Sequence, residues 1–205
     1  MRAAFLDTLG GQRIYPITDR QLSGLSHAEQ VAQLARLGFR LVQLREKYLS
    51  PLEFHDEAEA AMKVARAKNV CVLINDRVDI ALAVSAHGVH LGQDDLSVEG
   101  ARSLLGENAI IGFSTHSLEQ AQQAGDLPID YLALGPIFPT KTKEKADPVV
   151  GLEGLVQVKE SLPSLPLVAI GGIDATNREL AFSAGADAVA VISDLWSGLS
   201  KPEES

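Results

Sequence analysis

The segment Gly135–Lys143 carries the densest group of side chains that could hold an anion. It follows the apolar run Tyr131–Leu134, which has the composition of a buried strand. Two hydroxyl groups and two ammonium groups therefore gather just past a strand end. They belong to Thr140, Lys141, Thr142 and Lys143. Such a group suits a ligand with many oxygens, which indicates a phosphate or a pyrophosphate.

Two further strand ends have anion-binding character. Gly171-Gly172 follows the run Leu167–Ile170, and glycine lets the backbone N–H groups approach a phosphate closely. A tight turn is the alternative interpretation of the two glycines. Ile192-Ser193 follows the run Ala188–Val191 and adds backbone donors and a hydroxyl. Because three such sites follow three strands, we expect one pocket at the carboxyl edge of a sheet.

The segment Gln43–Lys47 ends another apolar run. Strand alternation places Gln43, Arg45 and Lys47 on one side and Leu44 on the other. The Gln43 amide offers both a donor and an acceptor to a heteroaromatic ring. Arg45 can bind a phosphate with two parallel hydrogen bonds, and Lys47 adds a mobile charge. A solvated charged rim is the alternative.

Carboxylates follow the next two runs. Asn75-Asp76 follows one run, and Asp94-Asp95 stands shortly after the other. Asp76 taken alone is compatible with a helix N-cap. Two carboxylates at adjacent strand ends, facing basic side chains, instead favour a magnesium ion shared with a pyrophosphate. Spacing does not choose between Asp94 and Asp95 as the second ligand.

Ser114 and His116 follow the fifth run. Ser114 can donate a hydrogen bond to a phosphate oxygen. His116 could act as a general base, and we favour an orienting or structural role for it. We expect a surface position for three other histidines and leave the fourth, inside a predicted strand, open. The three are His27, His55 and His87, and the fourth is His90.

Composition narrows the class of protein. The chain has 205 residues and a net charge of −9, which argues against nucleic acid as the main partner. Cys71 lies in an apolar run and is expected to be a buried small hydrophobe. No segment has the length and apolarity of a transmembrane helix, and Met1–Gly11 lacks the pattern of a signal peptide. We therefore expect a cytoplasmic protein.

Eight apolar runs alternate with helix-like segments. The runs are Ile14–Thr18, Phe39–Leu44, Val70–Ile74, Gly88–Leu91, Ala109–Phe113, Tyr131–Leu134, Leu167–Ile170 and Ala188–Ile192. Continuous apolar runs are typical of parallel strands covered on both faces. The pattern predicts an α/β fold, a parallel eight-stranded (β/α)8 barrel, as one domain over residues 1–205. A doubly wound open sheet is the alternative. Little chain follows Trp196, so the last helix is expected to be short or missing.

The helix-like segments carry their own start and stop signals. Ser26 with Glu29, and Ser50-Pro51 with Glu53, have the pattern of capping boxes. Three glycines stand where helices would end, at Gly38, Gly125 and Gly185.

In this order the motifs resemble the thiamine-phosphate synthase family. The matching blocks run from Ile14 to Ser193 and cover almost the whole chain. They are Tyr15–Asp19, Gln43–Lys47, Asn75-Asp76, His90–Asp95, Gly112–His116, Gly135–Lys143, Ile170–Ile173 and Val191–Ser193. Each block alone is weak, whereas the ordered set is highly specific. The short C-terminal end departs from the family, which usually has a fuller last helix.

The resemblance implies a barrel that joins a hydroxymethylpyrimidine pyrophosphate to a thiazole phosphate and releases pyrophosphate. It implies that the pyrimidine pyrophosphate is held by Gln43, Arg45, Lys47, Asn75, Ser114 and Lys143. It implies Mg²⁺ at Asp76 and Asp95. It implies that the thiazole phosphate is held by Thr140, Lys141, Thr142, Gly172, Ile192 and Ser193. Three cations would stabilise the charge on the departing pyrophosphate as catalytic residues: Arg45, Lys47 and Lys143.

Two other functions are compatible with parts of the pattern. A thiazole tautomerase, a related barrel, would use the histidine at position 116 as a base and would make no carbon–nitrogen bond. A non-catalytic phosphate sensor would use only Gly171-Gly172 and Ile192-Ser193. The set of pyrophosphate-binding residues favours the synthase over both. The partners expected are small molecules, with no nucleic acid and no membrane. The sequence leaves open a homo-oligomeric state and the choice between an aromatic and a carboxylated thiazole.

Overall fold

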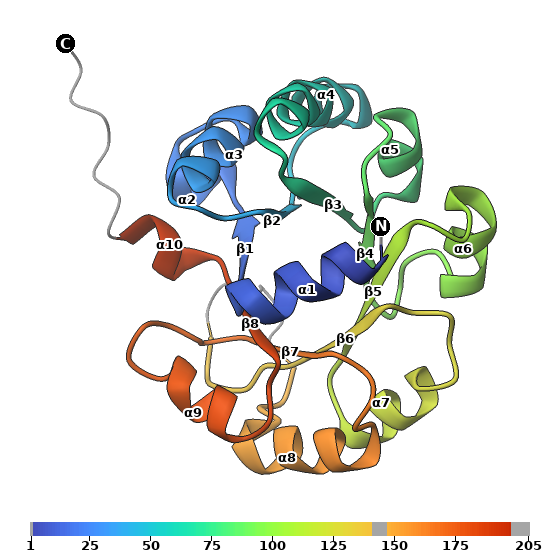
Figure 1. Ribbon diagram of the computed structural model, residues 1–205, viewed down its shortest axis with the longest axis vertical. Helices are drawn as coiled ribbons and strands as arrows, with labels where there is room; N and C mark the ends of the chain where they lie inside the picture. Colours follow the sequence, from blue (N-terminus) through green and yellow to red (C-terminus); the bar gives the residue numbers. More distant parts are fainter. Residues whose placement is uncertain (1, 141–146, 198–205) are drawn as a thin grey trace.

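The protein is a closed barrel of eight parallel strands surrounded by helices (Figure 1). The computed structural model describes residues 2–140 and 147–197. The strands are β1 (Ile14–Thr18), β2 (Leu41–Leu44), β3 (Cys71–Asn75), β4 (Gly88–Leu91), β5 (Ile110–Thr115), β6 (Tyr131–Leu134), β7 (Leu167–Ile170) and β8 (Ala188–Val191). The prediction of a (β/α)8 barrel is confirmed, and the doubly wound sheet is not found. That residues 1–205 form one domain stays a prediction.

The helices of the described residues lie mostly between successive strands. They are α1 (Arg2–Gln12), α2 (Arg20–Ser23), α3 (His27–Arg36), α4 (Pro51–Lys68), α5 (Val78–Ala83), α6 (Val98–Leu105), α7 (Leu118–Ala124), α8 (Gly151–Ser161), α9 (Arg178–Ser183) and α10 (Ser193–Ser197). Capping boxes begin α3 at Ser26 and α4 at Ser50, as predicted. None of these helices is long and apolar enough to cross a membrane.

The barrel closes between its first and last strands. Tyr15 of β1 stands opposite Ala190 of β8, and Pro16 stands opposite Val191. The helix after β8, α10, has five residues, so it is short within the described part of the chain. Closure therefore depends on pairing between β8 and β1 and needs no long eighth helix.

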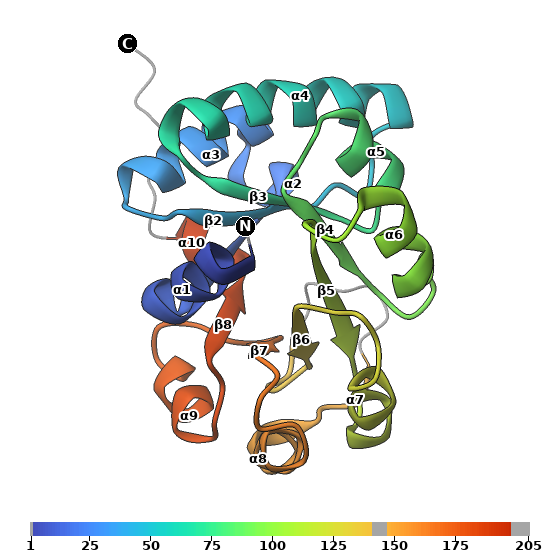
Figure 2. The same cartoon turned by 45° about the vertical axis from the view of Figure 1, so that its right-hand side comes forward.

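A helix that the sequence analysis did not predict covers one end of the barrel. Figures 1 and 2 show α1 lying across the barrel, next to β1 and β8. Phe5 and Leu9 of α1 are each 2% exposed and belong to the core inside the barrel. The Phe5 and Tyr131 ring centroids are 5.4 Å apart. Since α1 precedes β1, it fills the amino-terminal end and leaves the carboxyl end for chemistry.

A buried ion pair ties the outer helix layer to the sheet. Arg102 of α6 donates to an Asp130 carboxylate oxygen at 2.9 Å, just before β6. Asp130 also accepts from the Ile111 backbone N–H at 2.8 Å. Both charged side chains are nearly inaccessible to water, so each depends on the other for its stability.

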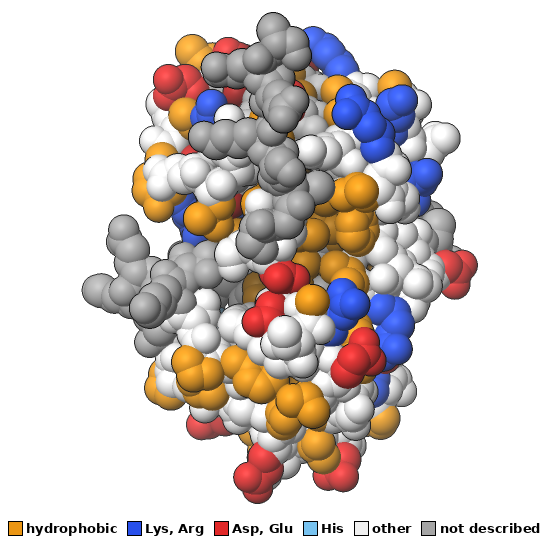
Figure 3. Space-filling model, turned by 90° about the vertical axis from the view of Figure 1, so that its left-hand side faces the viewer, with side chains coloured by type: hydrophobic (Ala, Val, Ile, Leu, Met, Phe, Trp, Pro, Cys, Tyr) orange, Lys and Arg blue, Asp and Glu red, His pale blue; other side chains and the backbone are white. Residues whose placement is uncertain are grey.

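The basic side chains do not form one continuous surface on the face seen in Figure 3. Lys and Arg side chains occur there in small groups, with acidic and apolar side chains beside them. This arrangement agrees with the net charge of −9.

Candidate active site

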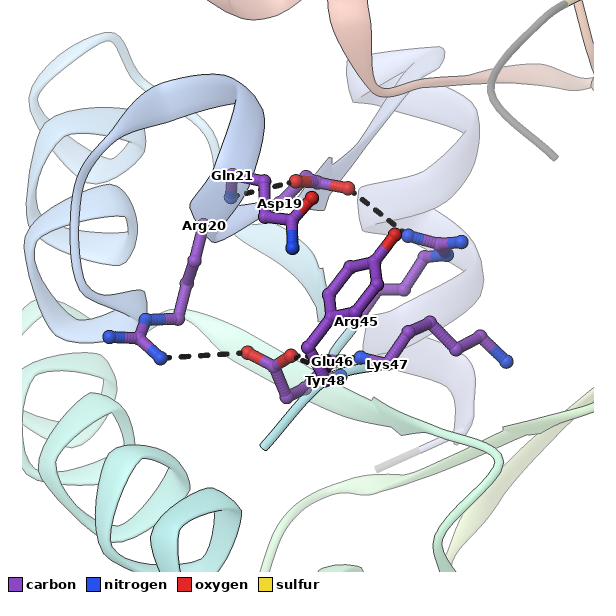
Figure 4. Close-up of a pocket in the computed structure, with 7 residues that line it drawn as sticks. All are labelled: Asp19, Arg20, Gln21, Arg45, Glu46, Lys47 and Tyr48. Carbon is purple, nitrogen blue, oxygen red and sulfur yellow. Dashed lines mark hydrogen bonds and ion pairs between the residues drawn. The ribbon is translucent and has the colours of Figure 1, made fainter. Parts of the chain in front are cut away.

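The carboxyl end of β2 presents two cations, and each has a carboxylate partner. Arg45 donates to Asp19 at 3.1 Å, as Figure 4 shows, and the Lys47 ammonium contacts Asp76. Arg45 also donates its backbone N–H to Thr18 at 3.3 Å. Residues that follow β1, β2 and β3 are therefore joined by charge pairs at one mouth of the barrel.

Asp19 is a site residue that the sequence analysis did not single out. Its carboxylate caps α2 by accepting the backbone N–H groups of Gln21 and Leu22, each at 3.0 Å. The other oxygen holds Arg45 and so fixes the direction of that guanidinium. Its position directly after β1 was the available signal, because the other acidic candidates also follow strands.

The two predicted metal ligands are neighbours. Asp76 has a φ of 64°, a left-handed conformation that is uncommon for a residue with a side chain. Its N–H donates to the His90 carbonyl at 2.8 Å, which joins the end of β3 to β4. Burial is the largest effect raising the pKa of Asp95. The Gly92 N–H opposes that effect, and the charge of Asp76 adds to it. Such repulsion between neighbouring carboxylates favours a cation between them.

The pair of carboxylates fits magnesium better than it fits a metal held by protein alone. Among residues 2–140 and 147–197, no three histidine, cysteine or acidic side chains form a group that could enclose a metal ion. Mg²⁺ commonly uses one or two carboxylates and completes its shell with water and substrate phosphates. Asp76 and Asp95 would supply that part of the shell. Asp94 is exposed, whereas Asp95 is half-buried beside Asp76.

The neutral predicted residues line the interior side of the same mouth. Gln43 lies in β2 and is 2% exposed, and its amide donates to the Tyr15 hydroxyl at 3.2 Å. Asn75 is the last residue of β3, in register with His90 of β4. Ser114 lies within β5, and its hydroxyl is 2.8 Å from His90 Nε2. Asn75 and Ser114 thus lie in the strands themselves, because β3 ends one residue later and β5 ends two residues later than the predicted runs.

The β6–α8 and β7–α9 loops pack against each other. Ile137 donates its N–H to the Ile170 carbonyl, and Phe138 donates to Gly171, both at 2.9 Å. Gly171 and Gly172 both have a positive φ, at 94° and 67°. A Cβ on Gly171 would lie 2.6 Å from Pro136 Cα, so only glycine permits this approach. The glycine pair therefore positions the loop that carries Thr140.

The other predicted phosphate-binding residues are placed as far as the structure describes them. Thr140 is half-buried and is the last residue described before the gap in the β6–α8 segment. Ile192 connects β8 to α10, and Ser193 is the first residue of α10. Lys141, Thr142 and Lys143 lie outside the described residues.

Comparisons with known proteins agree with this geometry. A family model described as thiamine monophosphate synthase matches residues 14–195. The chain is 46% identical over 183 residues to the thiamine-phosphate synthase of Syntrophomonas wolfei, which covers 89% of this chain and 87% of the relative. It is 47% identical over 190 residues to that of Koribacter versatilis, covering 89% and 88%.

The chain belongs to the thiamine monophosphate synthase family. A solved structure, the thiamine phosphate pyrophosphorylase from Pyrococcus furiosus, superposes with a TM-score of 0.81 at 37% identity. That match covers 92% of this chain and 88% of the other. The family expected from the motifs and the expectation of a transferase are confirmed.

His116 has an orienting set of hydrogen bonds in this member of the family. Its Nδ1 donates to the Gly135 carbonyl at 2.7 Å, because a carbonyl oxygen can only accept. Its backbone N–H donates to the Gln120 amide oxygen at 2.7 Å. The ring thus joins the end of β5 to the first residue after β6. This geometry agrees with the favoured structural role.

Two other histidines of the thiamine monophosphate synthase chain lie inside the fold. His90 is satisfied at both ring nitrogens, by Tyr131 and Ser114. The prediction of a surface position for His27 is wrong, since it is completely buried and its Nδ1 is 2.8 Å from Thr18 Oγ1. The Phe54 ring of α4 packs on it, with centroids 5.9 Å apart, and burial lowers the pKa of His27.

Proposed function

We propose that the chain joins 4-amino-2-methyl-5-(diphosphooxymethyl)pyrimidine to a thiazole phosphate, giving thiamine phosphate and pyrophosphate. The observation that carries the proposal is the group of paired charges at the ends of β1 to β4, in a chain with relatives named thiamine-phosphate synthase. A pyrophosphate leaving group needs such a concentration of cations and carboxylates at one place.

In this reaction the protein must stabilise the negative charge on the departing pyrophosphate and hold the two substrates in line for attack. An aminopyrimidine donates electrons to the carbon that loses pyrophosphate, so bond breaking can precede attack. Arg45, Lys47 and Lys143 are the proposed catalytic residues, because cations beside the departing oxygens would stabilise the charge that grows on them. The thiazole nitrogen is already a nucleophile and needs positioning, with no deprotonation. No nucleophilic serine or cysteine is required.

Magnesium is part of the proposal, with Asp76 and Asp95 as its protein ligands. When bound, Mg²⁺ neutralises part of the negative charge on the pyrophosphate. Lys47 already contacts Asp76, so a pyrophosphate that takes up the Lys47 ammonium leaves an Asp76 oxygen for another cation. The two carboxylates and the two cations of β2 thus serve the same ligand.

The other substrate is assigned to the opposite side of the mouth. Thr140, Lys141, Thr142, Gly172, Ile192 and Ser193 are the proposed ligands of the thiazole phosphate. The packing of the β6–α8 loop on Gly171 and Gly172 supports this assignment, since it brings the two loops together. Gln43, Asn75 and Ser114 are the proposed neutral contacts of the pyrimidine pyrophosphate. A cytoplasmic location and a homo-oligomeric state stay predictions.

The experiment is to mix both substrates with Mg²⁺ and to measure pyrophosphate and thiamine phosphate. A synthase releases both, a tautomerase changes only the thiazole, and a sensor changes neither. Failure to release pyrophosphate would refute the proposal.

Site variants test the proposed roles in the same assay. Lys143→Ala should slow single-turnover pyrophosphate release by roughly 2–4 kcal/mol of barrier, the size expected for one charge-stabilising donor. Asp76→Ala should raise the magnesium concentration needed for half-maximal rate. Lys63→Ala is the control, because Lys63 is exposed on α4 and pairs only with Glu59 at 3.2 Å among the contacts described.

A further inference from the structure

A chain of hydrogen bonds crosses the interior of the barrel between two of the proposed substrate contacts. Gln43 donates to the Tyr15 hydroxyl at 3.2 Å, and Tyr15 is 3.1 Å from the Tyr131 hydroxyl. Tyr131 is 2.8 Å from His90 Nδ1, and His90 Nε2 is 2.8 Å from Ser114 Oγ. Five strands each contribute one of these residues. The mechanism proposed above does not use the middle three, Tyr15, Tyr131 and His90.

The interior is built around this chain. Tyr15, Gln43, His90 and Tyr131 are each at most 6% exposed, so water does not compete for their polar atoms. A Cβ on Gly112 would lie 2.1 Å from the Tyr131 ring, so the absence of a side chain there makes room for it. Unpaired polar groups at this depth would be costly, which keeps every bond of the chain in place.

If each buried hydroxyl and ring N–H gives its proton to its neighbour in the series, the donor at one end sets the direction of every bond. The Gln43 amide nitrogen only donates, so Tyr15 accepts from it and passes its own proton to Tyr131. Tyr131 then donates to His90 Nδ1. Since Nδ1 accepts from Tyr131, the neutral ring carries its one proton on the other nitrogen. That proton is on Nε2 and is donated to Ser114.

The opposite direction is the only other consistent arrangement. If the Gln43 amide turns over, its oxygen faces Tyr15, and every proton in the chain moves to the other partner. Ser114 then donates its single proton inward to His90. The first direction leaves the Ser114 proton and the Gln43 oxygen for a ligand. The second leaves the Ser114 lone pairs and the Gln43 NH₂ group.

We propose that this buried series of hydrogen bonds couples the donor and acceptor roles of Gln43 to those of Ser114. Tyr15 and Tyr131 act as positioning residues. The inference rests on the proposed function and deepens it. An aminopyrimidine pyrophosphate offers an amino donor at one end and phosphate acceptors at the other. The first direction satisfies both groups together, with the Gln43 oxygen for the amine and the Ser114 proton for the phosphate.

The coupling makes the site selective for an amino group over an oxo group on the pyrimidine. An oxo oxygen placed where the amine binds needs the Gln43 NH₂ group as a donor, so the Gln43 amide must turn over. Every hydrogen bond of the series then reverses its direction, and Ser114 no longer donates its proton to the phosphate. In either direction an oxo analogue therefore loses one hydrogen bond, at Gln43 or at Ser114, that the amino compound makes. We expect the wild-type protein to bind the amino compound more tightly, on the order of 10- to 100-fold.

The first test uses the ligand-free protein and ¹⁵N-labelled histidine. The chain has five histidines, and a His90→Gln variant assigns the His90 signals in the nitrogen spectrum. The wild type should show a protonated Nε2 and an unprotonated Nδ1. Tyr15→Phe, which removes a hydroxyl that does not touch His90, should convert these signals to those of mixed tautomers. The opposite tautomer in the wild type, or unchanged signals in Tyr15→Phe, would overturn the proposal.

The second test measures selectivity by calorimetric binding of the amino compound and its oxo analogue. Tyr15→Phe and Tyr131→Phe should each reduce the preference to a few-fold. Phe5→Leu is the matched control, because Phe5 packs on the Tyr131 ring and carries no hydroxyl. It should keep the wild-type preference.

An unchanged preference in both tyrosine variants would overturn the coupling. If neither compound binds to the wild type, the proposed function fails. The tautomer measurement then still decides whether removing the Tyr15 hydroxyl changes the direction of the hydrogen bonds at His90.

Discussion

Acid should destabilise the wild-type protein more than it destabilises a His90→Gln variant. His90 is buried inside the barrel, and burial lowers its pKa from 6.5 to about 4. In the unfolded chain the ring titrates near its ordinary value of about 6.5. Between these two pH values the unfolded chain binds one proton more than the folded chain. The free energy of unfolding therefore falls as the pH falls.

The size of the effect follows from the interval between the two pKa values. Each pH unit in which only the unfolded chain is protonated costs about 1.4 kcal/mol. From 6.5 down to about 4 the loss amounts to roughly 3 kcal/mol. The His90 contribution is fully present above pH 6.5 and is lost on the way down to about pH 4. The glutamine side chain in the His90→Gln variant does not titrate, so the variant lacks this loss.

Urea unfolding followed by circular dichroism at several pH values between about 7 and 4.5 measures the effect. The difference in the free energy of unfolding between the wild type and His90→Gln should shrink by about 2–3 kcal/mol as the pH falls from about 7 to 4.5. Buried His27 and half-buried His87 also have a pKa lowered by burial, but both proteins contain them, so they cancel. His55→Gln, on the exposed side of α4, is the control and should follow the wild type. A pH-independent difference would refute the reasoning.

Three further predictions concern other parts of the fold. Gly171→Ala should raise KM for the thiazole phosphate at least tenfold in steady-state assays, whereas Gly38→Ala, with a φ of 96° and open space around it, should leave KM unchanged. Asp130→Asn should lower the free energy of unfolding by about 3–5 kcal/mol in urea, since it removes the counter-charge of buried Arg102. Phe5→Ala should cost about 3–5 kcal/mol in the same assay, and a loss below about 1 kcal/mol would mean that α1 does not fill the barrel.

Most of the barrel was predictable because its strands are short apolar runs between helix signals. The bounds of β1, β4, β6 and β7 agree with the predicted runs. The helix α1 was not predicted, because its hydrophobic residues do not recur at helical spacing and Gly10-Gly11 stands near its end. Its role comes from tertiary packing, since Phe5 and Leu9 reach the interior only after the barrel has closed.

The site was predictable to the extent that polar residues mark strand ends. Parallel strands bring their carboxyl ends together, so Arg45 and Asp76 could be placed at one mouth from sequence alone. Pairings across the barrel were not predictable in this way. Tyr15 and Tyr131 look like ordinary core residues in apolar runs, and their hydroxyl contact depends on strand order and tilt. His27 is buried by a ring from a different helix, Phe54, which no local pattern reveals.

The charge pairs at the mouth bear on how a pyrophosphate would bind. Arg45 is held by Asp19 and Lys47 contacts Asp76, so each cation already has a carboxylate partner before a ligand binds. A ligand anion therefore exchanges one partner for another, and less desolvation is left uncompensated than for bare cations. The exchange at Lys47 also sets an Asp76 oxygen free beside Asp95, where the two carboxylates repel each other. If Asp76 and Asp95 bind Mg²⁺ as proposed, uptake of the anion and uptake of the divalent cation would be linked through one lysine, and each should favour the other.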